Sequence, residues 1–137
     1  YEQFNGLRCR KVLVEAVTDG EAYSGWLLWL AEDRNWIPAR NVAYDYRSSE
    51  DVAMAESVVG EWKELRPGVW FPWKANTDTY HPDILHEKGR QKLYWRKEYE
   101  FQSVSLEPET NAETFTELEF PEGTEVRVIE GGSELIR

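Results

Sequence analysis

The sequence has few of the residues on which catalysis and metal binding usually depend. It contains one cysteine, Cys9, one methionine and two histidines among 137 residues. A single cysteine excludes an intrachain disulfide and a cluster of thiolate metal ligands, and such a residue is more often a small apolar core residue than a nucleophile. The chain also has no Gly-x-Ser-x-Gly motif and no glycine-rich loop before a helix, which argues against a serine hydrolase and a phosphate-binding loop.

Histidine and carboxylate patterns indicate neither a metal site nor an acid–base pair. The His-x4-His spacing of His81 and His86 matches neither a zinc-protease helix nor a zinc finger, and Pro82 interrupts regular structure between them. With 26 acidic residues, two facing carboxylates are expected by coincidence and do not indicate glycoside hydrolysis. We therefore predict a protein that is not an enzyme and that needs no metal or cofactor.

Long hydrophobic runs and a basic charge balance are also missing. The longest apolar run, Trp26 to Ala31, is far shorter than the roughly 20 residues that cross a bilayer, so we expect no membrane span. The net charge of −10 opposes binding to nucleic acid. Residues 106–137 carry nine acidic and two basic side chains. This concentration is typical of a solvated surface, with a docking surface for a basic partner as the alternative.

Aromatic residues are abundant: seven Trp, seven Tyr and five Phe. Each large ring can bury roughly 150–250 Å², which compensates for the modest apolar content. The length suits one core, so we expect a single domain over residues 1–137, with a frayed end at residues 131–137. The chain starts at Tyr1 rather than Met, so we expect a processed product or an excised part of a larger protein.

Segments with strand periodicity recur along the chain, with turn residues between them. They cover residues 8–17, 25–31, 36–46, 52–65, 69–78, 93–102 and 124–129. Residues 51–56 have helical propensity, but the β-favouring residues that follow and the hairpin around Arg66-Pro67-Gly68 favour a strand. We expect residues 81–91 to form a long polar connection and residues 111–115 a capped helical turn.

This pattern predicts a mainly β fold: a curved antiparallel sheet in meander order, with at most one or two short helices. Alternation assigns side chains to faces, because successive residues in a strand point to opposite sides. The segment 25–31 is apolar on both faces and is expected to lie centrally in the sheet. An open sheet has two edges, so self-association through a sheet edge is one expectation about partners.

Seven tryptophans exceed what a core of this size ordinarily needs. Any single Trp is expected to be a core residue, but a subset that lines an apolar surface for a ligand is an equal alternative for the set as a whole. The best candidates for a shared inward face are Trp73 and Trp95, which lie on segments with one alternating apolar face. The predicted ligand-contacting residues are Phe71, Trp73, Trp95, Tyr99, Trp26 and Leu28.

Three stretches of the sequence carry a family resemblance. They are Trp29 to Arg40, Trp62 to Pro72 with its Gly68-Val69-Trp70-Phe71-Pro72 run, and Phe115 with Phe120 to Val126. Together they resemble the later half of bacterial outer-membrane lipoprotein-sorting proteins. The resemblance implies an incomplete barrel in the periplasm or cell envelope, whose concave apolar face is covered by helices and accepts the acyl chains of lipoproteins.

The leading hypothesis is therefore a cell-envelope protein that binds a lipid-like ligand or a lipidated partner on a concave aromatic face of its sheet. A buried acyl chain contributes roughly 0.8 kcal/mol per CH₂ without any charged residue. One alternative is a β-sandwich carbohydrate-binding module that stacks sugars on Trp70 and Tyr80. The other is a purely structural interaction domain in which all seven tryptophans are buried.

Overall fold

The computed structural model describes residues 1–107, 122–125, 127–130 and 133–136. Contacts divide the chain into two compact units, Tyr1–Val104 and Ser105–Arg137, which are described separately below. The helical turn predicted at residues 111–115 lies outside the described residues.

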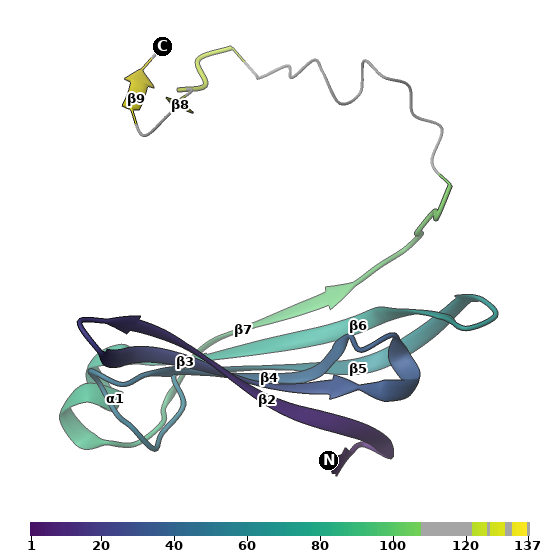
Figure 1. Ribbon diagram of the computed structural model, residues 1–137, viewed down its shortest axis with the longest axis horizontal. Coiled ribbons are helices and arrows are strands. Elements are labelled where there is room, and N and C mark those ends of the chain that lie inside the picture. The colour runs from purple at the N-terminus through teal and green to yellow at the C-terminus, as the bar shows by residue number, and fades with distance from the viewer. Residues whose placement is uncertain (108–121, 126, 131–132, 137) are drawn as a thin grey trace. The chain divides into compact units, whose positions relative to one another are not determined.

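The first unit is a seven-stranded antiparallel sheet in which each strand pairs with the next in chain order (Figure 1). The strands are β1 (Glu2–Phe4), β2 (Leu7–Thr18), β3 (Glu21–Ala31), β4 (Pro38–Asp45), β5 (Ala55–Arg66), β6 (Val69–Tyr80) and β7 (Leu93–Glu100). A 3-10 turn, η1 (Glu32–Arg34), follows β3. The predicted mainly β fold, a curved antiparallel meander, is confirmed, with β1 as an additional short strand.

Tight turns join the long strands where the sequence supplies residues that accept a positive φ. Asp19 and Gly20, between β2 and β3, have φ values of 54° and 80°, and Gly68, between β5 and β6, has 78°. Glycine pays no steric penalty in this region, which explains why these hairpins close at these positions.

Residues 81–91 differ from the predicted polar connection, because they contain a helix, α1 (Pro82–Lys88). Pro82 occupies the first turn, where its missing N–H costs nothing, and Gly89 ends the helix in the left-handed conformation with its N–H donated to the Leu85 carbonyl. Leu85 is only 1% exposed. The helix forms because it has a start signal, a stop signal and one buried anchor.

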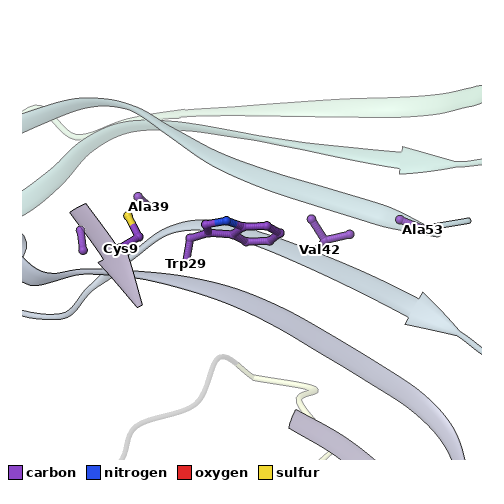
Figure 2. Close-up of a cluster of buried hydrophobic side chains, with 6 residues drawn as sticks. Cys9, Trp29, Ala39, Val42 and Ala53 are labelled. Carbon is purple, nitrogen blue, oxygen red and sulfur yellow. The ribbon is translucent and has the colours of Figure 1, made fainter. Parts of the chain in front are cut away.

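The buried core is a compact cluster on one side of the sheet (Figure 2). Its members are Cys9, Trp29, Ala31, Ala39, Val42 and Ala53. Cys9 is fully buried, and burial raises the pKa of its thiol, which confirms its prediction as a small core residue. The Trp29 indole N–H donates to Oε2 of Glu2 at 3.0 Å, and the Arg40 guanidinium lies 4.4 Å from the centre of a Trp29 ring.

The sheet is open and strongly curled, like half of a barrel. Phe4 in β1 and Trp62 in β5 both pack against the core cluster. In a flat sheet these strands would lie about 19 Å apart, four strand spacings. They meet the same cluster because the sheet bends toward it, so the cluster lies on the inner side of this curl.

In the second unit, β8 (Arg127–Glu130) pairs antiparallel with β9 (Ser133–Ile136). The sequence predicted a strand at residues 124–129 and a frayed end from residue 131. β8 overlaps the predicted strand, and the frayed end stays a prediction.

Candidate functional site

One face of the sheet is built from two rows of side chains that run across six strands. Residues paired in register share a face, so the pairings define each row. One row is Val12, Leu28, Asn41, Ser57, Thr77 and Lys97, and the other is Val14, Trp26, Ala43, Ala55, Thr79 and Trp95. Val59, Ala75 and Tyr99 extend this face. We call it the aromatic face.

The opposite face, which we call the charged face, also has two continuous rows. They are Lys11, Trp29, Arg40, Val58, Asn76 and Glu98, and Leu13, Leu27, Val42, Glu56, Asp78 and Arg96. Ion pairs join neighbouring strands here: Arg40 with Glu56 at 2.7 Å and Arg96 with Asp78 at 2.5 Å. The two faces therefore differ sharply, since Lys97 is the single charged residue in the two rows of the aromatic face.

Side-chain size varies across the aromatic face in a way that forms a trough. Small residues from β4, β5 and β6 form the floor, while large side chains from β3 and β7 form the walls. The floor is Ala43, Ala55, Ser57, Ala75, Thr77 and Thr79, and the walls are Trp26, Leu28, Trp95 and Tyr99. Trp26 is 39% and Trp95 40% exposed, so the walls stay open to a ligand.

Polar groups lie on the trough floor and beside it, and one of them, Oδ1 of Asn41, is buried without a hydrogen-bond partner among the described residues. The hydroxyls of Ser57 and Thr77 bond to each other at 2.8 Å. A hollow of about 220 Å³ lies beside them, lined by residues that include Asn41, Val59 and Ala75. This bond satisfies the proton of one of the two hydroxyls, so an apolar chain that covers the pair displaces fewer hydrogen bonds to water than it would over two separate hydroxyls.

Aromatic residues continue beyond Ala75 toward the β5–β6 hairpin. Phe71 packs edge-on against Phe101, with ring centres 4.8 Å apart, and the Lys63 ammonium lies 4.1 Å from the centre of a Trp73 ring. Phe71 and Trp73 follow the alternation of β6, so they extend the aromatic face along its length.

The structure brings all six predicted ligand-contacting residues to one face: Phe71, Trp73, Trp95, Tyr99, Trp26 and Leu28. The face on which these residues lie is not the expected one. The predicted face was the concave one, but the inner side of the curl near β1 and β5 is filled by Trp29 and its cluster, on the charged face. The two indoles of β3, Trp26 and Trp29, thus lie on opposite faces of the sheet.

Sequence reasoning missed the residues of the trough floor. Ala43, Ala55 and Thr79 are small or polar, and nothing in their own strands marks them as lining a site. The available signal was negative: β4 and the second half of β6 present small side chains at alternate positions, whereas β3 and β7 present aromatic ones. That contrast becomes a trough only when the register aligns it across three strands.

A larger hollow of about 600 Å³ lies on the charged face, lined in part by Lys74, Glu98 and Glu100. Lys74 lies 3.2 Å from Glu61 and 3.5 Å from Glu100, and these carboxylates raise the pKa of Lys74. Because its lining is charged, with one lysine and two carboxylates, this hollow offers little to an apolar ligand.

The residues named for sugar stacking do not form one platform. Trp70 and Tyr80 stand at opposite ends of β6, roughly 33 Å apart at the rise of an extended strand. The Arg34 guanidinium already covers the Trp70 ring at 3.7 Å, and burial raises the pKa of Tyr80. These observations count against the carbohydrate-binding alternative. The exposed indoles of Trp26, Trp36 and Trp95 likewise count against a domain whose tryptophans are all buried.

Among the residues that the structure describes, no group of three or more His, Cys, Asp or Glu side chains is placed to hold a metal ion. In that same part of the chain, no helix has the length and apolar character that a membrane crossing requires.

Comparisons with family models, curated proteins and solved structures found no match to this chain.

The ion pair between β6 and β7 predicts how stability depends on pH. Hydrogen bonds from Arg96 lower the pKa of Asp78 below its ordinary value of 3.8. A carboxyl whose pKa is lower in the folded state stabilises the protein above the unfolded pKa and loses that effect as the pH falls through the folded pKa. Asp78→Asn should therefore weaken the loss of stability below about pH 4.

Urea unfolding at a series of acidic pH values measures this effect. Asp51→Asn, at an exposed position in the loop after β4, is the matched control and should leave the slope unchanged. An identical acid dependence for Asp78→Asn and the unmodified protein would contradict the role of this ion pair.

Proposed function

We propose that this protein is a non-enzymatic binding protein of the cell envelope, and that its aromatic face holds the apolar chain of a lipid-like ligand or lipidated partner. The observation that carries the proposal is the trough, whose floor of small side chains lies between the indole walls of Trp26 and Trp95. The envelope location and the lipidated partner rest on the resemblance of the hairpin and turn motifs to lipoprotein-sorting proteins.

The physical basis of binding is desolvation of apolar surface. Tyr99 and Phe101 are 47% and 44% exposed, as open as the wall indoles. Covering such side chains with an acyl chain gains about 25 cal/mol for each Å² of apolar surface removed from water. A chain of 16 carbons that buries about ten CH₂ groups would gain about 8 kcal/mol before the cost of immobilising it.

Charge favours the same face. The protein carries a net charge of −10, yet the rows of the aromatic face contain no carboxylate and one cation, Lys97. The Lys97 ammonium lies 4.3 Å from the centre of a Trp95 ring, at the wall of the trough. An amphiphile with an acidic headgroup therefore meets no repelling side chain in these rows.

Titration with palmitate, followed by tryptophan fluorescence, tests this proposal. We expect a saturable spectral change, because Trp26 and Trp95 pass from partial exposure to an apolar contact. The change should become smaller in Trp95→Phe and persist in Trp36→Phe, whose ring lies in the turn after η1. No saturable change at palmitate concentrations below its micelle threshold would overturn the proposal.

A further inference from the structure

The outer edge of β7 is an unusually exposed sheet edge. β7 is the last strand of the first unit's sheet, all eight of its residues are exposed, and it contains no proline. An edge strand of this length presents a row of unpaired N–H and C=O groups to any strand that can align with it.

The hydrogen bonds to β6 show which residues of β7 direct their backbone outward. The Phe101 N–H donates to the Trp73 carbonyl at 3.0 Å. Because alternate residues of an antiparallel strand bond to opposite neighbours, Tyr99 and Lys97 also face β6. Arg96 and Glu98 therefore direct their N–H and C=O groups toward the open edge.

We propose that two copies of this chain pair antiparallel through β7, with Lys97 on the two-fold axis. In this register Arg96 lies opposite Glu98 of the second copy, and Trp95 lies opposite its Tyr99, each pairing occurring twice. Opposite charges and aromatic pairs directly across an antiparallel pair are both stabilising. Arg96 and Glu98, which direct hydrogen bonds outward, form the bonded pairs that this register requires.

The neighbouring register, with Glu98 on the axis, is less complementary. It places two Glu98 carboxylates opposite each other. It also requires Phe101, which is already packed on Phe71. The hydrogen bonds of Arg96 to Asp78 of its own sheet are the same in both registers, so they do not decide between them. In the proposed register the like charges on the axis are those of Lys97, whose ammonium is held over its own Trp95 ring at 4.3 Å.

Charges on an edge strand also serve to prevent pairing, and the experiment separates these roles. Sedimentation of the full chain over a range of concentrations should show a monomer–dimer equilibrium. Glu98→Arg converts two attractive pairs into repulsive ones and should weaken dimerisation by about tenfold or more. Glu64→Arg makes the same charge change at the β5–β6 hairpin and should leave the equilibrium unchanged.

Disulfide trapping tests the register. Residues on the axis of a non-bonded pair have Cα atoms about 4.5 Å apart, within the range that a disulfide spans. Lys97→Cys should form a covalent dimer under mild oxidation, whereas Lys63→Cys, an exposed position on β5, should not. The native Cys9 is fully buried and does not compete.

Circular dichroism of each variant checks that it is folded. A strictly monomeric chain, a dimer that Glu98→Arg leaves intact, or equal trapping at positions 97 and 63 would each overturn the proposal. Because the trough lies within one copy of the chain and palmitate binding needs no second copy, failure of the dimer leaves the proposed binding function standing.

Discussion

Replacing Trp29 with alanine is expected to lower the free energy of unfolding by about 3–5 kcal/mol, the usual cost of removing a buried indole. Trp29 is 5% exposed and lies at the centre of the core cluster. The substitution leaves a cavity between β2, β3 and β4 and removes one of the two side-chain partners of the Glu2 carboxylate, the other being Lys11. A loss of this size is a large part of the stability of an ordinary domain.

Urea unfolding measures the change, and Trp36→Ala is the matched control. Trp36 is 45% exposed and lies in the turn after η1, so its removal should cost less than about 1 kcal/mol. Equal losses for the two variants would show that the core cluster does not dominate stability.

Replacing Ala55 with glutamine is expected to weaken palmitate binding by about tenfold or more while the fold is retained. Ala55 lies on the trough floor between Ala43 and Thr79. The larger polar side chain displaces the ligand from the floor. Losing contact with two or three CH₂ groups costs about 2 kcal/mol, which corresponds to at least a tenfold change in affinity.

The matched control is Val58→Gln, on the same strand but on the charged face. Its partners across the sheet are Arg40 and Asn76, so its side chain lies on the charged face and points away from the trough. Titration with palmitate should show weaker binding for Ala55→Gln and unchanged binding for Val58→Gln. If Val58→Gln weakens binding as much as Ala55→Gln, the ligand does not lie on the aromatic face.

Much of the fold could be predicted because local signals agree with the tertiary structure. The clean alternation of residues 93–102 predicted β7, and the Arg66-Pro67-Gly68 turn predicted the β5–β6 hairpin. The same alternation assigned Trp95 and Tyr99 to one face, where the pairings place them.

The features that the sequence did not predict share a physical cause: their local sequence signal is weak or ambiguous. The helix α1 depends on one buried anchor, Leu85, within a polar segment, so it has too few apolar residues to show helical periodicity. Pro82 and Gly89 were its start and stop signals. Trp29 and Trp26 could not be separated from the sequence, since both lie in a run that is apolar on both faces.

The sequence by itself determined which residues of each strand share a face, because side chains alternate whatever the strand pairs with. It could not determine which face would be enclosed or which strands would align their small residues. The enclosed face and the alignment of small residues were decided by the register of the strands, by bulges and by the curl of the sheet. One such bulge lies between Val59 and Glu61, and the curl brings Phe4 and Trp62 to one cluster. These features arise from contacts between distant segments, which the alternation within any single strand does not encode.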